Sequence, residues 1–109
     1  LRQSPQNKMN LSIIIPLYNE EKLVLTLLQR LLDVQMPASV DTLEIVIVDD
    51  CSTDQSFVNV QQFIQDKPFI HLFRHEFNQG KGAAVRTGIG KSSGNVILIQ
   101  DADLELFPG

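Results

Sequence analysis

The chain has 109 residues and a formal net charge of −4, because nine Lys and Arg face thirteen Asp and Glu. That balance argues against a nucleic-acid partner, since proteins that bind nucleic acids normally carry a basic surface. A single cysteine excludes an internal disulfide and a cysteine-based zinc site, and it fits a reducing compartment. Hydrophobic residues make up 43% of the chain, enough for the core of one small domain. No apolar run approaches the roughly 18 residues of a membrane span, so we expect a cytoplasmic domain.

Four short apolar segments are expected to be β-strands, because they are rich in β-branched or aromatic residues. Most are nearly continuous rather than alternating, which is typical of strands buried on both faces of a parallel sheet. They cover residues 11–15, 43–48, 69–73 and 95–99. Residues 1–10 are polar and lack the apolar middle of a signal peptide, so they are expected to form a flexible leader.

Three helices are expected between the strands. The first follows Asn19, which is expected to cap it, and the second opens with Ser52 and Gln55 as an S-x-x-Q capping box. The third covers residues 80–90 and is rich in glycine and alanine. Glycine inside a helix costs about 1 kcal/mol relative to alanine, so this composition suggests close packing against a sheet or a ligand. The alternation of strands and helices predicts an open, doubly wound α/β fold with a mostly parallel sheet.

Acidic residues follow three of the four expected strands. They are Glu20 and Glu21, then Asp49, Asp50 and Asp54, and finally Asp101, Asp103 and Glu105. Ligands of open α/β sheets bind beyond the carboxyl ends of the strands, so we expect these loops to form one negative cleft. Such a cleft suits a cation, or the hydroxyls and ring N–H groups of a nucleoside.

Asp101 and Asp103 form the most informative pair. In an extended segment, residues i and i+2 point to the same side, so the two carboxylates can hold one hard cation. Mg²⁺ or Mn²⁺ suits oxygen ligands and keeps waters and substrate phosphates in its shell. A cation on a diphosphate would stabilise that group as it departs. The alternative for this pair taken alone is a solvated acidic turn.

Two other nucleotide-binding motifs are missing. The turn after the first strand has no G-x-G-x-x-G sequence, and the segment around Lys81 does not match a Walker A loop. Lys81 and Arg86 are instead candidates for binding a diphosphate, with exposed surface positions as the alternative. Tyr18 is a candidate for stacking on a base, with packing against the first helix as the alternative.

Taken together, four motifs resemble the nucleotide-binding half of a family 2 glycosyltransferase of the GT-A fold. The matching strings are IPLYNEE at 15–21, VDDCSTD at 48–54, NQGKGAAVRTG at 78–88 and QDADLE at 100–105. They occur in the family's order and cover the chain from residue 11 to its end. The last string resembles the polyprenyl-phosphate branch of the family, such as dolichyl-phosphate mannose synthase.

The resemblance implies a metal-dependent enzyme that transfers a sugar from a UDP- or GDP-sugar, with inversion, to a lipid phosphate or a glycan. The residues implied to bind the nucleotide and its sugar are Pro16, Tyr18, Glu20, Asp49, Lys81 and Asp101. Asp49 would hydrogen-bond the base or the ribose. Asp103, with Glu105, would coordinate Mg²⁺ or Mn²⁺ on the diphosphate.

The chain departs from the family's pattern in two respects. Cys51 stands where the family often has glycine, so we expect that turn to avoid the left-handed conformation. Residues 11–109 are expected to be the first part of a GT-A domain, cut shortly after the Asp-x-Asp motif. The general base and the acceptor half would lie beyond Gly109, so we expect no transfer by this chain alone. Attachment to the cytoplasmic face of a membrane would depend on those later segments.

Two alternatives stay open at this point. A phosphatase of the haloacid-dehalogenase type also uses Asp-x-Asp after a strand, but Glu105 stands where that family usually has Thr or Val. Its motif also normally follows the first strand of the fold and not the fourth. The other alternative is a non-catalytic nucleotide-binding or interaction module.

Overall fold

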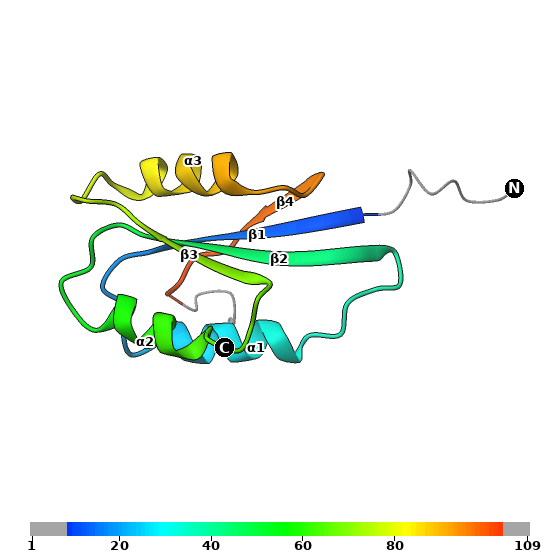
Figure 1. The fold of residues 1–109 in the computed structure, drawn as a ribbon, viewed down its shortest axis with the longest axis horizontal. Coiled ribbons are helices and arrows are strands. Elements are labelled where there is room, and N and C mark those ends of the chain that lie inside the picture. The colour runs from blue at the N-terminus through cyan, green and yellow to red at the C-terminus, as the bar shows by residue number, and fades with distance from the viewer. Residues whose placement is uncertain (1–8, 104–109) are drawn as a thin grey trace, which may run out of the picture.

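The computed structural model describes residues 9–103, which form one parallel sheet with helices on both faces (Figure 1). The strands are β1 (Met9–Leu17), β2 (Val40–Asp49), β3 (Ile70–Arg74) and β4 (Val96–Ile99). Their order in the sheet is β3-β2-β1-β4, and every neighbouring pair is parallel. The helices α1 (Val24–Asp33) and α2 (Ser56–Phe63) lie on one face, and α3 (Lys81–Lys91) lies on the other. The predicted doubly wound α/β fold is therefore confirmed.

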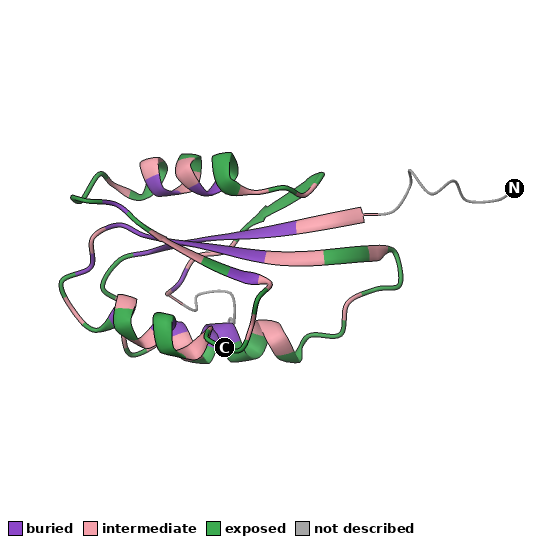
Figure 2. Cartoon of the chain, viewed as in Figure 1, coloured by how far each residue is buried: buried purple, intermediate pink, exposed green. Residues whose placement is uncertain are grey.

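The two central strands are buried on both faces, which explains their unbroken apolar sequences. Ile13 and Ile15 belong to the larger core cluster, together with residues of α1 and α2. Ile14 points to the other face, where it packs with Val46 and with Ala84 of α3. Burial is concentrated in the carboxyl-terminal halves of β1 and β2 (Figure 2), so the best-packed part of the sheet ends at the edge that carries the acidic loops.

Helix α3 lies close to the sheet because small residues face it. A Cβ added at Gly88 would clash with Cγ2 of Ile14, and the neighbouring contact residue Ala84 is fully buried. The prediction of close packing is thus confirmed, and the surface that α3 meets is the sheet.

Strand β4 forms one edge of the sheet, and its four apolar side chains are 39–49% exposed. Within the part of the chain that the structure describes, β4 pairs only with β1. In the same part of the chain, every helix is too short or too polar to cross a membrane.

The starts of β1, α1 and α2 differ from expectation. β1 begins at Met9, inside the segment expected to be a leader, and residues 1–8 lie outside the described part. α1 begins only at Val24, so Asn19 is not its N-cap. α2 begins at Ser56 without a side-chain cap from Gln55, so the predicted capping box is wrong as well. Both helix starts are set instead by bonds between the two loops, described below.

Candidate functional site

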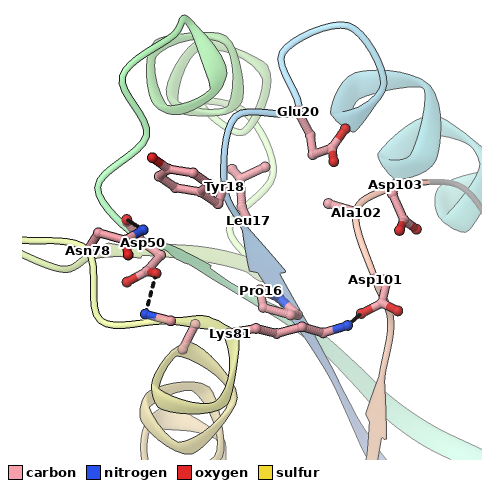
Figure 3. A pocket seen from close by; sticks show the side chains of 12 residues that line it. Pro16, Leu17, Tyr18, Glu20, Asp50, Asn78, Lys81, Asp101, Ala102 and Asp103 are labelled. Carbon is pink, nitrogen blue, oxygen red and sulfur yellow. Dashed lines mark hydrogen bonds and ion pairs between the residues drawn. The ribbon is translucent and has the colours of Figure 1, made fainter.

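A pocket of about 360 Å³ opens at the carboxyl ends of the strands, beside the N-terminus of α3 (Figure 3). This volume falls in the range of small-molecule sites. The lining residues come from the end of β1, from the loops after the four strands and from α3: Pro16, Leu17, Tyr18, Glu20, Asp50, Asn78, Gly80, Lys81, Ala84, Asp101, Ala102 and Asp103. The structure thus brings six of the predicted site residues to one pocket, namely Pro16, Tyr18, Glu20, Lys81, Asp101 and Asp103.

One side of the pocket is acidic. Glu20 projects from the loop after β1 toward the segment that carries Asp101 and Asp103 (Figure 3). Burial raises the pKa of Glu20, and the negative charges of Asp103 and Asp54 raise it further. The carboxylates are therefore close enough to repel one another. A bound cation or a hydrogen-bond donor from a ligand would relieve that repulsion.

Lys81 supplies a positive charge opposite these acids. Its ammonium forms an ion pair with the carboxylate of Asp101, which joins the start of α3 to the segment after β4 (Figure 3). The hydrogen bond to Asp101 raises the pKa of Lys81, and the charges of Asp101 and Asp103 add to this effect. The side chains of Lys81 and Asp101 are 62% and 45% exposed, so the pair contributes little stability. Either partner is accessible to a ligand.

Of the two residues predicted to coordinate the metal, Asp103 is described and Glu105 lies outside the described residues. Asp101, which the spacing also offers as a partner of Asp103 for a cation, is described as well. In the described part of the chain, no cluster of three or more His, Cys, Asp or Glu residues is arranged to hold a metal ion. Two carboxylates suit a cation that fills the rest of its shell with water and substrate phosphate, as Mg²⁺ does. The donor set therefore fits a cation that arrives with a phosphate ligand better than a permanently bound structural ion.

Asp50 lines the pocket but is not among the residues predicted to bind a ligand. Its Oδ1 accepts the backbone N–H of Gln79 at 2.9 Å, its Oδ2 accepts that of Gly80 at 2.8 Å, and Nδ1 of His75 lies 2.7 Å from Oδ1. Burial acts to raise the pKa of Asp50, but the hydrogen bonds from His75, Gln79 and Gly80 outweigh it and hold the pKa below its ordinary value. Asp50 is therefore an ionised carboxylate that anchors the loop before α3.

Asp49, which was predicted to bind the base or the ribose, is fully buried and does not line the pocket. Its carboxylate accepts hydrogen bonds from the N–H and the hydroxyl of Ser52 and forms an ion pair with Arg74 at 3.2 Å. The alternation of side chains along a strand explains the difference from Asp50. Val48 faces α3, so Asp50 does too, whereas Ile47 and Asp49 face the other helices. The alternation can be read from the sequence, and it could have identified Asp50 as the aspartate that lines the pocket.

The loops after β1 and β2 are joined by hydrogen bonds of Asn19. Its Oδ1 accepts the backbone N–H of Thr53 at 2.8 Å and of Asp54 at 3.3 Å, and its own N–H donates to Oγ of Ser52 at 2.9 Å. Asn19 adopts a φ of 50°, a left-handed conformation that asparagine tolerates better than most residues. Cys51 also has a positive φ, 66°, so the expectation that this turn avoids the left-handed region is wrong.

Acidic side chains at the two helix starts exchange hydrogen bonds. Oε1 of Glu21, which precedes α1, accepts the N–H of Gln55 just before α2 at 2.7 Å. In return, Oδ2 of Asp54, which precedes α2, accepts the N–H of Glu21 at 3.2 Å. Carboxylates at helix N-termini are favoured by the helix dipole. This exchange fixes the loop that carries Tyr18 and Glu20 on the pocket rim.

Of the two remaining candidates, Tyr18 lines the pocket and Arg86 does not. Tyr18 is exposed and lines the pocket, which makes its side chain accessible to a ligand. Arg86 is exposed on α3 and does not line the pocket, which fits its surface alternative.

Residues 12–109 match the protein-family model described as glycosyl transferase family 2. The chain belongs to this family. Over 101 residues it is 37% identical to the dolichyl-phosphate beta-glucosyltransferase of Homo sapiens, a match that covers 85% of the chain and 31% of that protein. Over 105 residues it is 30% identical to the dodecaprenyl-phosphate galacturonate synthase of Rhizobium johnstonii, covering 95% of the chain and 31% of that protein. The chain thus spans less than a third of the length of these curated relatives.

Solved structures of glycosyltransferases share the fold. The mannosyltransferase PcManGT from Pyrobaculum calidifontis, in complex with GDP-Man and Mn²⁺, superposes with a TM-score of 0.80 at 28% identity, over 94% of this chain and 30% of that one. TarS from S. aureus, in complex with UDP-GlcNAc, superposes with a TM-score of 0.76 at 32% identity, over 87% of this chain and 27% of that one. The fold is that of the nucleotide-binding half of a GT-A glycosyltransferase, and the phosphatase alternative gains no support.

Proposed function

We propose that the chain is the donor-binding part of a metal-dependent, inverting glycosyltransferase that uses a UDP- or GDP-sugar. The observation that carries this proposal is the pocket in which Lys81 faces Asp101 and Asp103 at the carboxyl edge of the sheet. The ammonium of Lys81 on one side, and the carboxylates of Asp101 and Asp103 on the other, suit a diphosphate that arrives with a divalent metal ion. Of the structural neighbours, one was solved with GDP-Man and Mn²⁺ and another with UDP-GlcNAc.

The nucleoside is proposed to occupy the side of the pocket formed by the loops after β1 and β2. Pro16 and the exposed ring of Tyr18 offer apolar surface to a base, and Glu20 offers an acceptor for ribose hydroxyls. Asp50 lines the same pocket. Its carboxylate oxygens already accept hydrogen bonds from His75, Gln79 and Gly80. Asp49 is fully buried, so we assign a base-facing role to neither aspartate.

The diphosphate is proposed to lie between the start of α3 and the segment after β4. Lys81 would exchange its bond to Asp101 for one to a phosphate oxygen, since its side chain is exposed and flexible. Asp103, with Glu105, would hold Mg²⁺ or Mn²⁺, and Asp101 would face the ribose and the sugar. When bound, the cation supplies charge stabilisation to the departing nucleoside diphosphate.

The acceptor is proposed to be a polyprenyl phosphate. The support is that the relatives from Homo sapiens and Rhizobium johnstonii are named for dolichyl phosphate and dodecaprenyl phosphate. A glycan acceptor is the alternative. An acceptor oxygen that attacks the sugar carbon on the side opposite the leaving diphosphate would invert that carbon. We assign no general base among residues 9–103, and we place the reaction at the cytoplasmic face of a membrane.

Calorimetry tests the donor site directly. UDP, GDP and their sugar derivatives are titrated with and without Mn²⁺ into this chain, and into the whole encoded chain where the gene continues. We expect binding that depends on Mn²⁺ and that Asp103→Asn weakens by about tenfold or more, the size of losing a charge-assisted contact. Asp66→Asn is the control, because Asp66 is an exposed carboxylate outside the pocket. Equal affinity with and without Mn²⁺, in a folded protein, would refute metal-dependent donor binding. Binding by the whole encoded chain without sugar transfer would favour the non-catalytic module.

A further inference from the structure

His75 is a buried histidine that the candidate site does not include. It follows β3 and is only 9% exposed. Its Nδ1 lies 2.7 Å from Oδ1 of Asp50, and its Nε2 lies 2.8 Å from Oγ1 of Thr87 in α3. Its backbone N–H donates to the carbonyl oxygen of Asp49 at 2.9 Å. The imidazole ring is thus held at both nitrogens between the sheet edge and α3.

The two ring contacts fix different parts of α3. An ionised carboxylate can only accept, so Nδ1 of His75 carries the proton that is donated to Asp50. Asp50 in turn accepts the N–H groups of Gln79 and Gly80, directly before the helix. Thr87 lies farther along the same helix. His75 therefore connects both the start and the middle of α3 to the ends of β2 and β3.

Helix α3 has no side-chain cap at its N-terminus. Its N-cap residue is Gly80, with a φ of 99° and no side chain to cap the helix. Gly82 lies in the first turn, and glycine lowers helix stability. Lys81, the first residue of α3, must nevertheless present its ammonium to the pocket. A distant carboxylate, oriented by His75, takes the place of a local cap.

We infer that His75 is a positioning residue for Lys81: by holding Asp50 and Thr87 it keeps the N-terminal turn of α3 at the pocket edge. The inference rests on the proposed function only in that Lys81 is taken to bind the diphosphate. His75 touches no ligand in this account. Its effect on diphosphate binding passes entirely through Lys81.

The test uses four single variants, together with Lys81→Ala and its combination with His75→Ala. His75→Ala removes both ring contacts. His75→Asn provides a shorter amide that can donate to Asp50 without reaching Thr87, and Thr87→Val removes only the hydroxyl. His71→Ala is the matched control, because His71 lies on β3, four residues before His75, and is exposed. Circular dichroism selects a temperature at which every variant is folded. Calorimetry then compares a nucleoside diphosphate with Mn²⁺ against the same nucleoside alone, and a double-mutant cycle combines His75→Ala with Lys81→Ala.

We expect His75→Ala to weaken diphosphate binding by about tenfold, as for the loss of one hydrogen bond to a charged group, while nucleoside affinity stays within about twofold. The loss should disappear in the Lys81→Ala background. His75→Asn should recover most of the affinity, and His71→Ala should have no effect. The inference would be overturned if His75→Ala weakened the binding of nucleoside and of diphosphate equally. It would also be overturned if His75→Ala weakened diphosphate binding by the full tenfold in the Lys81→Ala background.

Hydrogen exchange separates this inference from the proposed function. In the ligand-free protein, His75→Ala should speed exchange at the amides of Gln79 and Gly80 relative to the wild type, whether or not any nucleotide binds. Unchanged exchange at both amides would refute the positioning role. Absence of diphosphate binding by the wild-type protein would instead refute the donor-site proposal, and would leave the exchange result to decide on His75.

Discussion

Replacing Gly88 by alanine tests the packing that places α3 beside the pocket. Two effects oppose each other. Alanine favours a helix over glycine by about 1 kcal/mol, but the new Cβ would overlap Cγ2 of Ile14. Ile14 is fully buried and β-branched, so its side chain has little freedom to move aside. Overpacking of this kind costs about 1–3 kcal/mol. After the helix-propensity gain is subtracted, we expect Gly88→Ala to lower the free energy of unfolding by up to about 2 kcal/mol.

Gly90 provides a matched control in the same helix, because a Cβ there would meet nothing within 4 Å. Gly90→Ala should therefore stabilise the protein by about 0.5–1 kcal/mol. Urea unfolding, followed by circular dichroism, measures both variants under the same conditions. The reasoning fails if Gly88→Ala is as stabilising as Gly90→Ala, because α3 would then not press on Ile14.

Two further predictions concern the polar network. Asn19→Ala removes an acceptor of two N–H groups and places alanine at a φ of 50°. It should lower the free energy of unfolding, measured in urea, by about 1–3 kcal/mol, and Asn19→Gly should lower it less. Equal stability of the wild type and both variants would contradict the role of these hydrogen bonds. Hydrogen bonds hold the pKa of Glu44, Asp50 and Asp54 below their ordinary values. Their contribution to stability is present at neutral pH and is lost as the pH falls below about 4. In acid-unfolding curves, Asp50→Asn should make the free energy of unfolding depend less steeply on pH below about 4. An unchanged slope would contradict the contribution of the Asp50 carboxylate.

The fold was predictable because local patterns decide it. The apolar run at 11–15 and the stripe at Val24, Leu27 and Leu28 indicate burial without knowledge of distant contacts. The acidic loops could be assigned to one sheet edge because parallel strands place their carboxyl ends together. Six of the predicted site residues accordingly line one pocket.

What the sequence did not predict depends on contacts between distant residues. Asn19 and Asp54 bond across two loops, and neither bond is visible in a local capping pattern. Cys51 adopts a positive φ that its residue type disfavours. No local motif marks His75, because its partners Asp50 and Thr87 lie 25 and 12 residues away from it in the chain. Only Asp50 was within reach of sequence reasoning, through the alternation along β2.

Separate loops are proposed to form one site for a nucleoside diphosphate and its metal ion. Paramagnetic broadening by Mn²⁺ in the presence of UDP or GDP tests it most directly, since Mn²⁺ broadens backbone amide signals close to it. The account predicts broadening at Ala102 and Lys81, together with shifts at Tyr18, while Glu44, outside the pocket, stays unaffected. Broadening that spares Ala102 and Lys81 in a folded protein saturated with nucleotide would contradict the account.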